Sequence, residues 1–150
     1  WSIGFGGFGE VLPNPNNRMY LDSEKKDKWG IPMIVFDAAF GENEIAMRKD
    51  IANSAAEMLE AAGFKSITTY NRPEVHLGLG IHEMGTARMG KDPKTSVLNK
   101  FNQIHACKNV FVTDGAAMAS SSCVNPSLTY MALTARAADF AVAELKRKNL

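Results

Sequence analysis

The chain has 150 residues, of which 45% are hydrophobic, and its formal net charge is +1. This composition supports a folded core and excludes a disordered tail. Acids and bases are interspersed, so the charge gives no basis for binding nucleic acid or an anionic membrane. No apolar run approaches the roughly 20 residues that a membrane-spanning helix needs.

The sequence starts at Trp1 without a signal-like segment, so we interpret it as a processed protein or as part of a longer chain. On this interpretation a targeting signal lies outside the sequence, and cytoplasmic and periplasmic locations both stay open. For Cys107 and Cys123 we expect two buried thiols rather than a disulfide, because free cysteine packs as a small hydrophobe.

The first ten residues, WSIGFGGFGE, formally match GxGxxG between Gly4 and Gly9. A dinucleotide-binding loop needs a strand before the glycines and a helix after them. Here nothing precedes them, and a run of Asn and Pro turn formers follows. We therefore expect a loose glycine-rich entry segment of about 15 residues, and no phosphate loop.

Strands are predicted at residues 18–21, 31–40, 64–70 and 75–79, with a polar loop over residues 22–30. A helix is predicted from Asn43 to Ala62, with Asn43 as its N-cap and Gly63 just past its end. Its predicted buried face is marked by Ile45, Lys49, Ala52, Ala56 and Leu59.

Residues 80–109 are rich in turn formers, and a short strand is predicted at residues 110–113, before Asp114 and Gly115. A long helix follows, with Asn125 as N-cap and Pro126 as its first residue. Its predicted buried face comprises Leu128, Met131, Ala132, Ala135, Ala138, Val142 and Leu145. This order predicts an α+β fold, with a mostly antiparallel sheet backed by helices and a C-terminal strand, loop and helix in a separate layer.

The segment GIHEMGTARMG contains the one histidine that invites a catalytic interpretation, His82. It is not the zinc motif HExxH, because Thr86 stands where the second histidine belongs, and no metal site is predicted. Spacing alone leaves His82 as either a structural or a catalytic residue. The position of Asn125 is explained by a helix cap and that of Asp114 by a turn, so spacing alone does not make either a site residue, while Arg88 is expected to hold backbone carbonyls.

A family resemblance rests on HEMGTARMG, on the following Asp92–Pro93, and on NVFVTDGAAMASSSCVNPSLTYMALTARAAD. In order and spacing these resemble the C-terminal part of the glucose–methanol–choline (GMC) oxidoreductases, with their H-x-x-G-T-x-R-M-G and N-P-x-x-T motifs. LPNPNNRMYLD and KDKWGIP resemble linking strands of the branch that oxidises gluconate and sugars. The resemblance thus covers nearly the whole chain.

The resemblance implies a flavoenzyme that oxidises alcohols. It implies that residues 1–109 are the substrate-binding cap region and that residues 110–150 belong to the FAD-binding layer, the N-terminal dinucleotide domain being absent. His82 corresponds to the family's catalytic histidine, and Asn125 to a second catalytic histidine or asparagine. Asp114 and Gly115 resemble residues near the FAD ribityl and pyrophosphate; Asn125, Pro126 and Thr129 resemble the helix start near the flavin ring.

The implied reaction moves the hydroxyl proton of a sugar, sugar acid or polyol to His82 and a hydride to flavin N5. The implied partners are that alcohol or sugar substrate, the missing FAD domain of the same protein and an unknown electron acceptor. The alternative, from another class, is a non-catalytic binding or interaction module that is inactive as an isolated fragment.

Overall fold

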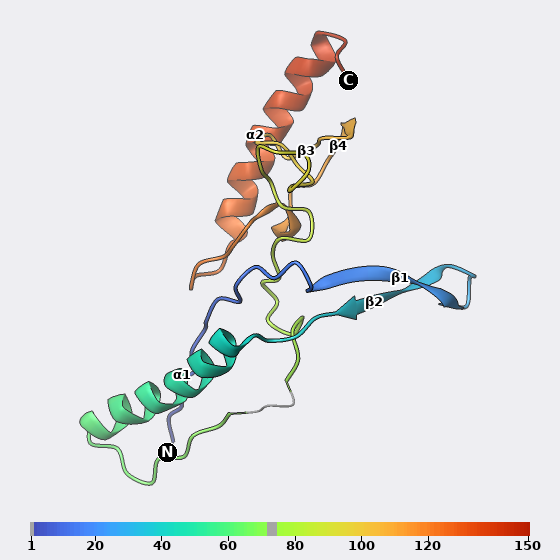
Figure 1. The fold of residues 1–150 in the computed structure, drawn as a ribbon. Coiled ribbons are helices and arrows are strands. Elements are labelled where there is room, and N and C mark those ends of the chain that lie inside the picture. Colours follow the sequence, from blue (N-terminus) through green and yellow to red (C-terminus); the bar gives the residue numbers. More distant parts are fainter. Residues whose placement is uncertain (1, 72–74) are drawn as a thin grey trace. The chain divides into compact units, whose positions relative to one another are not determined.

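The computed structural model describes residues 2–71 and 75–150 and confirms the α+β fold (Figure 1). The chain divides into two compact units, Trp1–Leu79 and Gly80–Leu150. The first contains strands β1 and β2 and helix α1, and the second contains strands β3 and β4, the short 3-10 helix η1 and helix α2. Within the described ranges, no helix has both the length and the apolar character to cross a membrane.

The first unit holds an antiparallel hairpin of β1 (Arg18–Lys26) and β2 (Pro32–Asp37), so both predicted strands are confirmed. The loop predicted to begin at Asp22 is wrong, because β1 continues to Lys26. The Asp22 carboxylate accepts the N–H groups of Glu24 and Lys25, both at 2.9 Å. These two hydrogen bonds occur where the pairing of β1 with β2 shifts register, after Leu21. They satisfy the backbone N–H groups of polar residues, which therefore remain in the strand.

Helix α1 (Glu42–Ala61) confirms the predicted helix, but its cap differs from the prediction. Gly41, not Asn43, is the N-cap, and its N–H donates to Oε2 of Glu44 at 2.7 Å. The other carboxylate oxygen of Glu44 accepts the N–H of Leu12 at 3.0 Å. The start of α1 is therefore fixed by Glu44, a residue of its first turn, and not by the side chain of its N-cap. The bond from the N-cap N–H to Glu44 is the one that the N3 residue makes in a capping box.

The predicted buried face of α1 is confirmed only in part, since Ala52, Ala56 and Leu59 are half-buried. Ile45 is 58% exposed, whereas Met47 and Ile51 contact the N-terminal glycine segment. A Cβ atom added at Gly9 would lie 2.6 Å from Met47, and one at Gly7 would collide with Ile51. The glycines thus let an extended backbone without helix or strand lie directly on the helix.

The strands predicted at residues 64–70 and 75–79 are wrong: neither segment is a strand in the described structure. Their β-branched and alternating patterns favour extended backbone, but a strand also needs a partner to pair its N–H and C=O groups. Ser66 has φ 59° and Gly78 has φ 90°, values that interrupt an extended run.

The second unit begins its regular structure with an antiparallel hairpin of β3 (Gln103–Ile104) and β4 (Cys107–Phe111). The strand predicted at residues 110–113 therefore starts and ends earlier. Asn102, fully buried with φ 62°, binds Val112 through both its backbone C=O and its side-chain amide, each at 2.9 Å. Cys107 and Cys123 are both free and exposed, so the expected burial is wrong.

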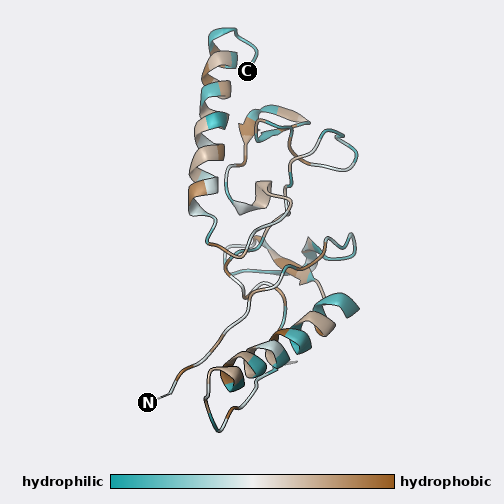
Figure 2. Ribbon diagram, turned by 90° about the vertical axis from the view of Figure 1, so that its left-hand side faces the viewer, coloured by the Kyte–Doolittle hydropathy of each residue, from teal (hydrophilic) through white to brown (hydrophobic). Residues whose placement is uncertain are grey.

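Helix α2 (Ser127–Lys146) lies beside this hairpin (Figure 1), and the face that it packs is opposite to the predicted one. Ala137 is buried, and the Phe140 ring stacks on Phe101 with centroids 4.1 Å apart. In contrast, Leu128 and Met131 of the predicted face are 78% and 68% exposed. Apolar residues occur on both sides of α2, as Figure 2 shows by hydropathy, so periodicity could not select the packed side.

The start of α2 also differs from the prediction. Pro126 is the N-cap, where Asn125 was predicted, and no side chain caps the helix. The missing N–H of proline and its fixed φ suit a helix entry, so this position needs little help from a neighbouring side chain. The Asn125 side chain therefore makes no cap bond.

Candidate active site

His82 lies in a turn that the carboxylate of the next residue holds. Oε1 of Glu83 accepts the N–H groups of Gly80 at 2.8 Å and Ile81 at 3.2 Å. Ile81 has φ 68°, a left-handed conformation that is rare for a β-branched side chain. His82 itself is half-buried, and its ring makes no hydrogen bond with any described residue. The turn is thus fixed by the Glu83 carboxylate, and the imidazole of His82 makes no bond that would hold it in place.

The segment after His82 runs beside η1 (Gly115–Ala117), the 3-10 helix that follows β4. The N–H of Ala87 donates to the carbonyl of Ala116, and that of Met89 to Ala117, both at 2.9 Å. Asp114 is the N-cap of η1 and accepts the N–H of Ala116 at 2.9 Å. Its expected role as a turn residue is therefore confirmed.

Gly115 is buried where three segments meet. A Cβ atom there would lie 3.0 Å from both the Glu83 carbonyl and the Met84 sulfur, and 2.8 Å from the Tyr130 hydroxyl. That hydroxyl also donates to the Met84 sulfur at 3.6 Å. Gly115 therefore allows the His82 turn, the Asp114 turn and the first turn of α2 to approach one another.

The remaining predicted site residues lie at the start of α2. Pro126 is buried, whereas Asn125 and Thr129 are exposed, and their side chains form no hydrogen bond with the described residues. The structure thus brings the His82 turn into contact with Gly115 directly. Asn125 and Thr129 are connected to that turn only through Tyr130, which follows them along the chain.

Sequence reasoning missed Tyr130 and Glu83. Tyr130 stands four residues after the buried Pro126, one turn along the same helix face, and this register would have pointed to it. Nothing in the sequence marked Glu83, because its role depends on the conformation of the turn. Arg88 does hold backbone, as predicted, since Nη2 donates to the Thr95 carbonyl at 2.5 Å.

Among the residues that the structure describes, no group of three or more His, Cys, Asp and Glu side chains could hold a metal ion. The chemistry available at the site is therefore that of an uncoordinated imidazole, an uncapped helix start and free amide and hydroxyl groups. Such groups can bind and orient a polar ligand and exchange a proton with it.

Comparison with known proteins identifies the family of the chain. Residues 13–134 match the family model of the GMC oxidoreductases, and the chain belongs to that family. It is 38% identical over 136 residues to 2-methyl-1,2-propanediol dehydrogenase of Mycolicibacterium austroafricanum, covering 89% of this chain and 24% of that protein.

Two further relatives act, by their names, on sugars or sugar acids. The large subunit of fructose dehydrogenase from Gluconobacter japonicus is 37% identical, over 92% of this chain and 25% of its own length. The gluconate 2-dehydrogenase flavoprotein of Pantoea cypripedii is 30% identical, over 79% of this chain and 20% of its own length. The chain therefore spans about a quarter or less of the length of these relatives.

Proposed function

We propose that this chain is the substrate-binding, flavin-covering part of an FAD-dependent oxidoreductase that acts on CH–OH groups of a sugar, sugar acid or polyol. The observation that carries the proposal is the free imidazole of His82 on a turn packed against Gly115 and Tyr130. The names of the matched diol, fructose and gluconate dehydrogenases support the substrate class.

The start of α2 is suited to contact the ring of a flavin. This helix of 20 residues has neither a side-chain cap nor an acidic residue in its first turn. Its first N–H groups and its positive dipole end are therefore available to an electron-rich acceptor. Asn125, Pro126 and Thr129 would contact the ring here, and Asp114 with Gly115 the ribityl and phosphate region. Bound FAD would supply the hydride acceptor.

His82 would accept the proton of the substrate hydroxyl. A half-buried imidazole without a hydrogen-bond partner among the described residues can point either nitrogen at a substrate. The bonds from Glu83 to Gly80 and Ile81 would keep the turn from rearranging when the ring takes up a charge. We regard Glu83 as a positioning residue in this reaction.

Asn125 would donate its side-chain N–H to the substrate oxygen as negative charge develops there. An amide can stabilise an alkoxide without competing with His82 for the proton. Because Pro126 caps α2, the Asn125 side chain is not committed to the helix start. The sequence left Asn125 either as a helix cap or as a catalytic residue. Because its side chain makes no cap bond, it is free for the catalytic role.

The flavin-binding domain would cover the free face of α2. Leu128, Met131 and Val142 on that face are between 50% and 78% exposed, although the helix packs its other face. Such an apolar side on a surface helix is typical of a binding interface. Since the chain spans about a quarter of the diol and fructose dehydrogenases, we infer that a dinucleotide-binding domain is the occupant.

The test is flavin reduction by substrate in the complete enzyme, measured by stopped flow. His82→Ala should slow reduction by about two to four orders of magnitude, and His82→Gln should do the same. His76→Ala, which removes a histidine of the first unit, is the matched control and should leave the rate unchanged. Reduction at the normal rate in His82→Ala would refute the role of base.

A further inference from the structure

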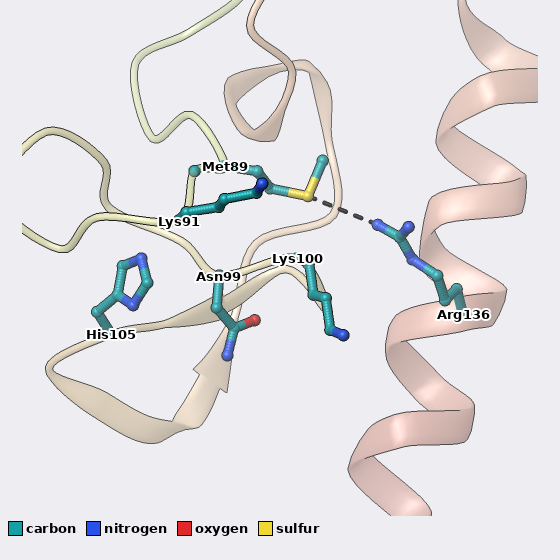
Figure 3. Close-up of a pocket in the computed structure, with 7 residues that line it drawn as sticks. Met89, Lys91, Asn99, Lys100, His105 and Arg136 are labelled. Atoms are coloured by element: carbon teal, nitrogen blue, oxygen red, sulfur yellow. Dashed lines mark hydrogen bonds between the residues drawn. The ribbon is translucent and has the colours of Figure 1, made fainter.

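A cavity lies in the unit of residues 80–150, and its lining begins at Met89, seven residues after His82. Its volume is about 490 Å³, and it is lined by Met89, Gly90, Lys91, Asn99, Lys100, His105 and Arg136 (Figure 3). The cavity lies between the segments leading to β3 and helix α2. The predicted site residues do not take part in it.

The lining is cationic and contains no acid. Lys91, Lys100 and Arg136 contribute three positive charges, and none of the lining residues is Asp or Glu. Both ion pairs among the described residues involve other arginines, Arg18 and Arg147. Like charges gathered around one cavity repel each other, so an anion placed between them would be favoured.

The arginine of this cluster is anchored from two sides. Nη2 of Arg136 approaches the Met89 sulfur at 3.6 Å (Figure 3), and it also approaches Oδ1 of Asn102 at 3.4 Å. Asn102 is fully buried and is itself held by the Val112 carbonyl. The guanidinium is thereby oriented by a rigid neighbour, while its other N–H groups remain available to a ligand.

Lys100 and His105 also have defined surroundings. The Lys100 ammonium lies 5.0 Å from the centre of the Phe101 ring, which stacks on Phe140. Oγ of Ser96 donates to the Asp92 carbonyl at 2.7 Å, so it accepts from Nε2 of His105, 3.1 Å away. The His105 ring therefore carries its proton on Nε2, and its Nδ1 makes no bond with the described residues.

We propose that this cavity binds the phosphate group of a small organic phosphate. Two ammonium groups and one guanidinium match the double charge of a phosphate monoester better than the single charge of a carboxylate. The volume exceeds what a phosphate alone fills and lies in the range of small-molecule sites. The organic part would then lie over Met89 and Gly90.

The probe is glycerol 3-phosphate, titrated into the 150-residue chain at constant ionic strength and followed by amide NMR shifts. We expect saturable shifts at Lys91, Lys100 and His105, and none with glycerol. The Lys91→Gln/Lys100→Gln variant should bind at least about tenfold more weakly. Lys94→Gln/Lys146→Gln, which loses the same charge outside the cavity, should bind normally.

A parallel titration with inorganic phosphate tells whether the organic part contributes, since weaker binding of the free ion supports the organic phosphate. Equal weakening in both double variants, or shifts that rise linearly with glycerol 3-phosphate and do not saturate, would show a general charge effect and overturn the site. Equal affinity for inorganic phosphate would overturn the assignment of an organic phosphate.

Discussion

Gly115 and Tyr130 are packed so closely that a single methyl group cannot fit between them. A Cβ atom at Gly115 would lie 2.8 Å from the tyrosine hydroxyl. The same methyl group would meet the Glu83 carbonyl at 3.0 Å, and this backbone atom cannot swing aside as a flexible side chain can. The absence of a side chain at residue 115 therefore sets the distance between α2 and the His82 turn.

Gly115→Ala should accordingly destabilise the chain by about 1–3 kcal/mol, because it overpacks a buried contact. Chemical denaturation would measure the loss, and the fluorescence of Tyr130 would report the displaced ring. Gly80→Ala is the control, since its added methyl group would meet only Oε1 of Glu83 at 3.7 Å. Equal stability of the Gly115 variant and the native chain would contradict the packing described.

Asn125→Ala distinguishes a capping role from a catalytic one. Loss of an N-cap side chain typically costs about 1 kcal/mol, but Pro126 caps α2 without a side-chain bond. We expect the stability of the chain to change by less than about 0.5 kcal/mol. Substrate-driven flavin reduction in the complete enzyme should nevertheless fall by roughly 10²-fold, as for other lost oxyanion donors.

The opposite result for Asn125→Ala, lost stability with a normal rate, would return this residue to the role of helix cap. Thr129→Val offers a comparison in the same turn, since its hydroxyl also makes no bond within the described chain. It should leave stability nearly unchanged and weaken flavin binding.

The two faces of α2 should respond differently to truncation. Phe140→Ala removes the ring stacked on Phe101 and should cost about 2–3 kcal/mol in the isolated chain. Val142→Ala, on a side chain that is 50% exposed, should cost less than about 0.5 kcal/mol. A large cost for Val142→Ala would show that the predicted face, not the observed one, is packed.

The Glu44 carboxylate should make the attachment of α1 sensitive to acid. The Leu12 N–H lowers the pKa of Glu44 below its ordinary value of 4.5, partial burial opposes this, and the Gly41 N–H adds to it. A lowered pKa means that the folded state favours the ionised form, so its stabilisation is complete above pH 4.5 and is lost as the pH falls through the lowered value.

We therefore expect the Leu12 and Gly41 amides to lose their protection from hydrogen exchange as the pH drops below 4.5. Glu44→Gln should show weaker protection at neutral pH and little further change with acid. An equally steep acid response in Glu44→Gln would assign the effect to another carboxylate.

The sequence alone determined those features that depend on neighbouring residues. Helix positions follow from periodicity, and the Asp114 turn and the Arg88 contacts follow from local turn chemistry. The ordered motifs from His82 to Asp139 identified the family, and the match of residues 13–134 to the family model confirms it.

Only the tertiary structure decided which of two apolar faces α2 buries, because both faces satisfy the same helical period. It also decided how α1 holds the N-terminal segment, since Glu44 reaches Leu12 across 32 residues and no local pattern encodes that contact. The strands expected at residues 64–70 and 75–79 did not form, because β-propensity cannot supply a partner strand. The contact of Tyr130 with Gly115 likewise exists only once η1 and α2 are packed together.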